Sequence, residues 1–312
     1  METLTYAGYD NCLRLTNNTV ELVVSAGFGP RILHYGLHHG PNAFALCPTL
    51  SKDVGNGEAW KPYGGHRFWT APEVFPRSYF PDNGPAASAE MEGDTLHIAS
   101  TTEHKTGLQK ELLLTLASEG AAVRVVHKLT NHNVWPVTVA AWGLSIVANG
   151  GRVVLPQEPY VSHDNDLLPA RPVVLWKFTE MGDPRWRWGT KYITLRQDDL
   201  PEGRPQKVGV YSTLGWAAHL TPQQAFIVHC PVAPEGADAF PDGGSSFETY
   251  TDGPFQELET LSPLRTLAPG ASLSHTEDWY LAPPAPMDDT DASLDTHLLP
   301  IIAEAKKARG AF

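Results

Sequence analysis

Two carboxylates lie two residues apart in the segment 255–263, which reads FQELETLSP. The segment alternates as a β-strand does, so Glu257 and Glu259 share one face of it with Phe255 and Leu261. Carboxylates among apolar neighbours cost free energy unless they are paired or used by a ligand. The pattern therefore indicates either an exposed strand with two solvated acids or a site in which a carboxylate acts as a general base.

A second group suited to ligand binding lies in the early segment 64–73, which reads GGHRFWTAPE. His66 can exchange protons near neutral pH, and Arg67 presents a fork of donors to oxygen-rich ligands. Trp69 offers a flat apolar face to a sugar ring, and Glu73 can accept hydrogen bonds from its hydroxyl groups. A packed turn with Arg67 paired to Glu73 is the plainer interpretation, but this density of polar and aromatic side chains favours a ligand site.

Further basic and aromatic residues could complete such a site. Lys110 alternates with Leu108 and Leu112, which turns it inward toward a carboxylate partner or a ligand. Most of the nine Trp residues are expected in the core, and three beside polar loops are candidate sugar platforms: Trp69, Trp176 and Trp188. The sequence contains no phosphate-binding glycine motif and no Gly-x-Ser-x-Gly, so a carbohydrate fits better than a nucleotide, and nucleophilic hydrolysis lacks support.

Composition excludes several classes of partner. The 312 residues carry a formal net charge of −12, from 23 basic and 35 acidic residues, without a basic cluster. Nucleic acid and anionic membrane surfaces are therefore not expected as partners. No apolar run is long enough to span a bilayer. The first residues, METLTYA, lack the regions of a signal peptide, so we expect a cytoplasmic protein unless a leader has been trimmed.

The sequence predicts neither a metal nor a cofactor. Its three cysteines are widely spaced, which argues against a disulfide framework and against a structural zinc site. The segment 163–166, HDND, has spacing that could hold a cation, but a solvated loop is the favoured interpretation.

Strand and turn patterns predict the framework that positions these groups. Alternating or β-branched runs recur between turns from residue 19 to residue 281, without strand–helix alternation. This pattern favours an all-β fold, an antiparallel sandwich in one domain. Two regions, 48–90 and 156–187, are expected to be long irregular loops that serve a function or are ordered by a ligand.

The C-terminal end is expected to differ from the rest. Residues 283–291 form a Pro/Asp linker, and 293–309 form a helix capped by Ser293 or Asp291. Pro300 is expected to break the middle of this helix or to shift its start. The chain is therefore divided into a carbohydrate-active β domain over 1–282 and a linker with a helix over 283–312.

Several short segments resemble the galactose mutarotase-like superfamily, which includes the aldose 1-epimerases, and more specifically a bacterial branch of it, the DUF4380 group. The matching segments are 64–69, 72–73, 126–131, 142–144, 156–157, 176, 183–185, 207–209 and 257–263. They indicate the branch more strongly than any one reaction. The resemblance implies an antiparallel β-supersandwich with a sugar site in a groove across one sheet.

The resemblance also implies roles for individual residues. A Glu in a Leu-Glu-Thr segment is the general base of the aldose 1-epimerases, and Glu259 matches it. Their catalytic acid is a His, but Trp142 stands near that position here, so His66, or less readily His163, is assigned the acid role. Their early arginine, which binds sugar hydroxyls, is matched by Arg67. The expected substrate-binding residues are Arg67, Trp69, Glu73, Lys110, Trp142, Arg185, Lys207 and Glu257.

Three functions are compatible with this pattern. The first is an isomerase like the aldose 1-epimerases, which interconverts the anomers of a small sugar or sugar acid by general acid/base catalysis. The second is a carbohydrate-binding or sensing protein without turnover, which the missing family His favours. The third is a glycoside-cleaving enzyme that pairs Glu259 with Glu73 or Glu257, ranked last because Glu257 and Glu259 approach a substrate from one side. No oligomeric state follows from the sequence.

Overall fold

The structure is a computed structural model that describes residues 1–55, 57–167, 171–198, 204–232, 235–284 and 288–312. One set of strands is β1 (Glu2–Tyr6), β2 (Tyr9–Thr16), β3 (Val20–Ser25), β4 (Arg31–Leu37), β5 (Leu46–Cys47), β6 (Tyr63–Ala71), β11 (Val137–Val147), β13 (Val173–Leu175), β16 (Gln206–Val210), β19 (Phe247–Thr251), β20 (Gln256–Leu261) and β21 (Arg265–Leu267). The other set is β7 (Ser88–Glu92), β8 (Thr95–Ala99), β9 (Leu108–Leu116), β10 (Val123–Asn131), β12 (Arg152–Pro156), β14 (Trp186–Trp188), β15 (Tyr192–Arg196), β17 (Trp216–Leu220), β18 (Ala225–His229) and β22 (Ser272–Ala282). The helical elements are η1 (Ala237–Ala239), α1 (Asp291–Ala308) and η2 (Arg309–Ala311).

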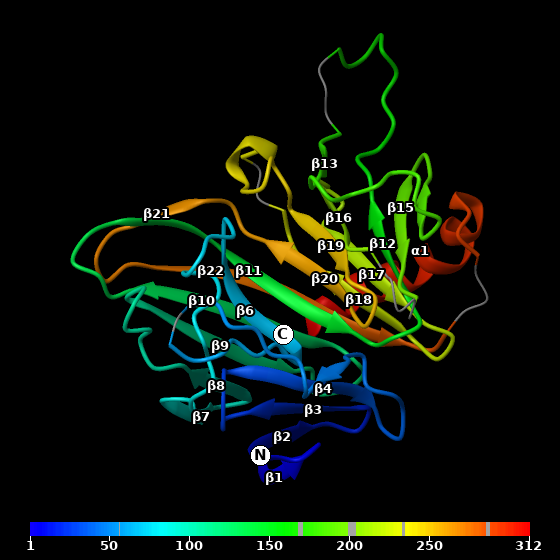
Figure 1. Cartoon of the computed structure of the whole chain (residues 1–312). Helices are drawn as coiled ribbons and strands as arrows, with labels where there is room; N and C mark the ends of the chain where they lie inside the picture. The colour runs from blue at the N-terminus through cyan, green and yellow to red at the C-terminus, as the bar shows by residue number, and fades with distance from the viewer. Residues whose placement is uncertain (56, 168–170, 199–203, 233–234, 285–287) are drawn as a thin grey trace.

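The two sets of strands form two antiparallel sheets that pack face to face (Figure 1). The first sheet runs β1-β2-β3-β4-β6-β11-β20-β19-β16-β13, with β5 beside β6 and β21 beside β11. The second runs β14-β15-β12-β17-β18-β22-β10-β9-β8-β7. Apolar side chains from both sheets meet in one large core. The expected all-β antiparallel sandwich is confirmed.

Alternation along the central strands separates the core from a second, polar face of the first sheet. On β20, Leu258 belongs to the core between the sheets, whereas Glu257 and Glu259 lie on the opposite face. On β6, Phe68 belongs to that core and Trp69 packs in a separate cluster on the opposite face. Glu257 and Glu259 therefore share a face, as their spacing predicts, but that face is buried and not solvated.

The two regions expected to be irregular contain strands. The first includes β6, a central strand of the first sheet, and the second includes β13 and the start of β14, with residues 168–170 outside the described part. Gly65 allows β6 to lie beside β4 in the sheet. Its φ is +71°, and a Cβ there would lie 2.1 Å from the carbonyl oxygen of Ile32 on β4. Only a residue without a side chain allows the two strands to approach so closely.

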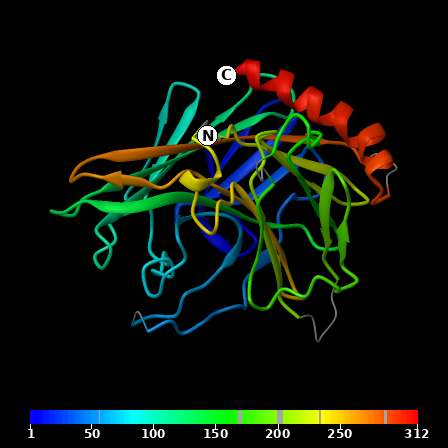
Figure 2. The same cartoon turned by 90° about the horizontal axis from the view of Figure 1, so that it is seen from above.

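Helix α1 lies along the outside of the sandwich (Figure 2). Four of its residues pack on the outer face of the second sheet: Leu294, Leu298, Ile302 and Ala305. The expected cap is wrong, since Thr290 precedes the helix and its hydroxyl accepts from the backbone N–H of Ser293. Pro300 lies inside an unbroken helix. Residues 285–287 of the expected linker lie outside the described part, and the division of the chain at residue 282 stays a prediction.

Among the residues that the structure describes, no helix is both long enough and apolar enough to cross a membrane.

Candidate functional site

A pocket of about 410 Å³ lies on the polar face of the first sheet, over β6, β11, β20, β19 and β16. Its aromatic lining consists of Trp60, Trp69, Tyr79, Trp142, Trp176, Phe178, Tyr250 and Phe255. Its polar lining includes Arg67, Glu73, Lys207, Asp252 and Glu257. Aromatic walls with a few converging polar groups are typical of a small-molecule site.

Arg67 and Glu257 form an ion pair at the floor of this pocket. The Arg67 Nη2 atom donates to Glu257 Oε1 over 2.7 Å, and both side chains are buried. The guanidinium carbon lies 4.6 Å and 5.5 Å from the ring centres of Trp69 and Trp60. Within the described part of the chain, the Nε and Nη1 atoms of Arg67 have no hydrogen-bond partner. Two donors are thus available to a ligand.

Glu257 is held in an environment that favours its protonated form. Burial raises the pKa of Glu257; the charge of Arg67 opposes this and that of Glu259 adds to it. The net result is a pKa above the ordinary value of a glutamate, so Glu257 binds a proton more readily than an exposed carboxylate does.

Lys207 connects a second pair of carboxylates beneath the pocket. Its Nζ atom lies 2.9 Å from Glu259 Oε2 and 2.8 Å from Glu248 Oε2. Burial lowers the pKa of Lys207, but Glu248 and Glu259 outweigh this and raise it above its ordinary value. Lys207 is therefore a permanent cation, packed against Trp142 and Trp176 at 4.9 Å and 4.7 Å from their ring centres.

Glu259 has one oxygen fixed and one without a partner. Its Oε2 atom accepts from Lys207 and, over 2.9 Å, from Trp142 Nε1. Its Oε1 atom is buried and finds no hydrogen-bond partner among the described residues. A fixed carboxylate with an unpartnered oxygen is well suited to accept a proton or a hydroxyl hydrogen bond.

His66 does not reach this pocket. As the neighbour of Arg67 on β6 it points to the opposite face, into the space between the sheets. There its Nε2 atom lies 2.7 Å from Nε2 of His127. Burial lowers the pKa of His66 well below its ordinary value, and His127 lowers it further, so the ring is neutral.

Two of the expected substrate-binding residues also lie elsewhere. Lys110 on β9 pairs with Glu103 at 2.6 Å and lines a separate small cavity. Arg185 pairs with Asp183 at 2.8 Å. His163 is exposed and does not line the pocket. Six of the expected residues line the pocket: Arg67, Trp69, Glu73, Trp142, Lys207 and Glu257. The expected base Glu259 does not line it; its side chain is fully buried beneath, against Trp142 and Lys207.

Sequence reasoning missed several residues of this site. Glu248 and Tyr250 alternate on β19 just as Glu257 and Glu259 do on β20, so the same rule could have identified them. Trp60 and Tyr79 come from the segments before and after β6, and no spacing pattern indicates that they pack against each other and against Trp69 beside Arg67.

No protein-family model and no curated protein matches the sequence. Solved structures match over most of the chain. A candidate aldose 1-epimerase from Klebsiella pneumoniae is 12% identical, with a TM-score of 0.60 over 97% of this chain and 86% of its own. The Slr1438 protein from Synechocystis is 10% identical, with a TM-score of 0.54 over 91% of this chain and 100% of its own.

A third match is a TPR-domain containing protein from Parabacteroides distasonis, which is 12% identical with a TM-score of 0.58. The match covers 89% of this chain and 48% of that protein. At such identities these likenesses show the fold alone. The chain has the galactose mutarotase-like antiparallel sandwich.

Proposed function

We propose that the pocket binds the ring of a small sugar and interconverts its anomers, as an aldose 1-epimerase does, with Glu259 as the general base. The unpartnered Oε1 atom of buried Glu259, beside the ion pair of Arg67 and Glu257, is the observation that carries this proposal. The fold is consistent with it by analogy, because one fold can host several chemistries.

The character of the pocket supports the proposal of sugar binding. Aromatic faces pack against the C–H bonds of a pyranose ring, and four of the lining residues are Trp. The free Nε and Nη1 donors of Arg67 and the free Nε1 of Trp60 would be satisfied by ring hydroxyl groups. At and beneath the floor, the described residues place three carboxyl groups, Glu248, Glu257 and Glu259, against the two cations Arg67 and Lys207, so there is no net positive charge even with Glu257 protonated. A neutral sugar therefore suits this floor better than a sugar acid or a sugar phosphate.

The reaction needs a base for the anomeric hydroxyl and an acid for the ring oxygen. These two oxygens are bonded to the same carbon, so the base and the acid can approach from one side. Glu257 stands two residues from Glu259 on the same face of β20, and its raised pKa suits it to donate the proton. Glu257 takes the acid role in this proposal in place of His66.

Sugar binding without turnover is the second candidate. It is favoured by Trp142, whose Nε1 donates to Glu259, and by the lack of a histidine among the described pocket residues. Affiliation with the DUF4380 group and a cytoplasmic location are also proposals, because both rest on the sequence alone.

The test uses freshly dissolved single anomers of neutral aldoses and of a uronic acid, followed by NMR of the anomeric protons. Wild-type protein is expected to accelerate the approach to equilibrium for a neutral sugar, and Glu259→Gln to abolish the acceleration. Glu119→Gln, at an exposed turn, is the control and should behave as wild type. Binding shifts without acceleration would support the second candidate and reject catalysis.

A further inference from the structure

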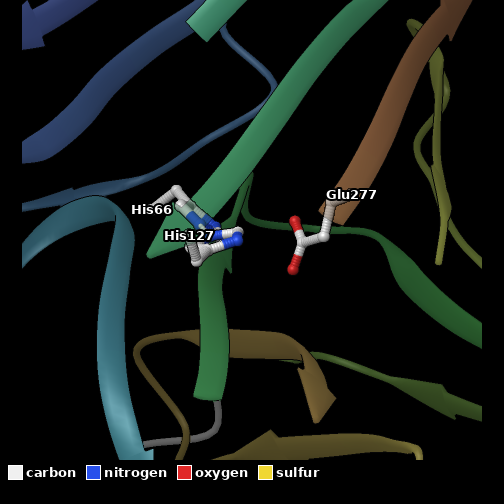
Figure 3. A group of neighbouring side chains, drawn as sticks. All are labelled: His66, His127 and Glu277. Carbon is white, nitrogen blue, oxygen red and sulfur yellow. Dashed lines mark hydrogen bonds between the residues drawn. The ribbon is translucent and has the colours of Figure 1, made fainter. Parts of the chain in front are cut away.

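Three potential metal ligands meet between the two sheets, on the opposite face of the first sheet from the pocket. His66 comes from β6 of the first sheet, and His127 and Glu277 come from β10 and β22 of the second. Figure 3 shows the two imidazole rings side by side with the carboxylate of Glu277 turned toward them. All three side chains are buried, and their ligand atoms lie within 4.8 Å of one another.

The outer nitrogen, Nδ1, of each ring has a partner of its own, and the two inner nitrogens, Nε2, form a hydrogen bond with each other. His127 Nδ1 lies 3.1 Å from the backbone carbonyl of His275, and a carbonyl only accepts. His127 Nδ1 therefore carries the hydrogen, and its Nε2 atom presents a lone pair. His66 Nε2 then donates to His127 Nε2, and the hydroxyl of Ser145 can donate to His66 Nδ1 over 2.9 Å. A metal bound at His66 Nε2 would move that hydrogen to Nδ1, from which Ser145 can accept it. Histidine ligands are commonly oriented by such outer hydrogen bonds.

Glu277 supplies a negative charge that the surrounding protein does not balance. Its carboxylate accepts from Trp279 Nε1 over 2.6 Å and from the hydroxyl of Thr260. No basic side chain of the described residues forms an ion pair with it. A buried carboxylate without a cation is costly, and a bound divalent ion would remove that cost.

Space for the carboxylate is provided by Gly143 on β11. A Cβ atom at this position would lie 2.3 Å from Glu277 Oε1 and 3.2 Å from Cε1 of His66. A side chain on Gly143 would therefore displace two of the three ligands.

We propose that Nε2 of His66, Nε2 of His127 and a carboxylate oxygen of Glu277 bind a divalent transition-metal ion, Zn²⁺ by preference, which links the two sheets. Two imidazoles and a carboxylate are a common zinc ligand set, with the fourth position left to water. The Nε2 atoms, now 2.7 Å apart, need to separate to roughly 3.3 Å to share a tetrahedral zinc ion at normal bond lengths. Small rotations of the two rings achieve this.

Spacing along the chain predicts no such site, because the three ligands come from strands far apart in the sequence. The proposed ion lies behind the sheet, away from the pocket, so this inference is independent of the proposed sugar chemistry.

The test begins with protein freed of metal by chelator and titrated with Zn²⁺ by calorimetry, and with Co²⁺ by visible absorption. One equivalent is expected to bind with the intense absorption of tetrahedral Co²⁺. Excess Zn²⁺ should raise the unfolding midpoint by roughly 5 °C at a hundredfold excess over Kd. A titration without saturation at one equivalent, or an unchanged midpoint, would overturn the proposal.

Variants identify the ligands. His127→Gln and Glu277→Gln should each weaken Zn²⁺ binding more than tenfold. If either fails to fold, Ser145→Ala, which removes only the outer partner of His66, should still weaken binding by roughly tenfold. Two controls should bind Zn²⁺ as wild type does: Glu259→Gln, beneath the pocket on the opposite face of the sheet, and His219→Gln, a buried histidine outside the cluster. Equal binding by wild type, Glu277→Gln and Ser145→Ala would assign the metal to surface histidines and reject the site.

Discussion

Lys207 Nζ lies 2.9 Å from Glu259 Oε2, although the two residues belong to strands β16 and β20, which are separated by β19. The middle strand contributes Glu248 to the same cation. One lysine thus compensates two buried carboxylates beneath the pocket. This relationship fixes the position of the proposed base and makes Lys207 essential to the stability of the floor.

Replacing Lys207 with Met should destabilise the fold. The change leaves Glu248 and Glu259 buried without a cation, and breaking a buried ion pair typically costs about 3–5 kcal/mol. Urea unfolding measures the loss. Lys191→Met removes a comparable but exposed pair with Asp295 and should change stability little. Equal effects of the two substitutions would contradict the role assigned to Lys207.

Replacing Arg67 with Lys should weaken sugar binding more than it weakens the fold. Lys keeps the charge opposite Glu257 but lacks the planar fork whose Nε and Nη1 donors are free. Loss of one or two such hydrogen bonds is expected to lower the affinity for a neutral sugar by roughly tenfold. Titration by Trp fluorescence follows this directly, because four Trp residues line the pocket.

The exposed Arg265→Lys serves as the control for that titration. An Arg67→Lys protein with wild-type affinity would show that these donors do not contact the sugar.

Acid should destabilise the fold partly through His219. Burial lowers the pKa of His219 to about 3, whereas the unfolded chain keeps the ordinary value of about 6.5. Between these values the unfolded state binds a proton that the folded state does not, so stability falls as the pH drops below about 6.5. From pH 7 to pH 5 this one group should cost roughly 2 kcal/mol.

The contribution of His219 is isolated by comparing the pH dependence of urea unfolding for wild type and His219→Gln. Between pH 7 and pH 5, His219→Gln should lose about 2 kcal/mol less stability than wild type. The exposed His163→Gln should follow wild type. Parallel profiles for wild type and His219→Gln would show that His219 does not contribute to acid sensitivity.

Adding a methyl group at Gly143 should destabilise the core between the sheets. Its Cβ would meet Glu277 Oε1 at 2.3 Å, and overpacking of this kind typically costs about 1–3 kcal/mol. Gly182→Ala is the matched control, because a Cβ there has no neighbour within 4 Å. The unfolding temperatures of the two variants give the comparison. Equal midpoints would mean that Glu277 and His66 move aside for the methyl group without loss of stability.

Local patterns in the sequence predict the sandwich and the shared face of Glu257 and Glu259. Both follow from alternation, which depends only on neighbouring residues. The same rule separates His66 from Arg67, but only once segment 64–73 is understood as a strand and not as a loop. That reassignment depends on Gly65, whose positive φ lets β6 lie against β4.

Contacts between distant segments could not be predicted in this way. Lys110 and Arg185 are as basic as Lys207, but they pair with Glu103 and Asp183, close to them in the chain. Only strand order brings Lys207 to Glu259, and only the packing of two sheets brings His66 to His127. A single sequence does not contain this long-range information in a readable form.

The most direct test of the account is magnetisation exchange between the α and β anomers of a neutral aldose at equilibrium. The rate is measured with wild-type protein, Glu259→Gln and the control Glu119→Gln, each shown to be folded and to bind the sugar. The account predicts fast exchange for wild type and for Glu119→Gln, and the uncatalysed rate for Glu259→Gln. Exchange by Glu259→Gln at the wild-type rate would contradict the assignment of Glu259 as the base.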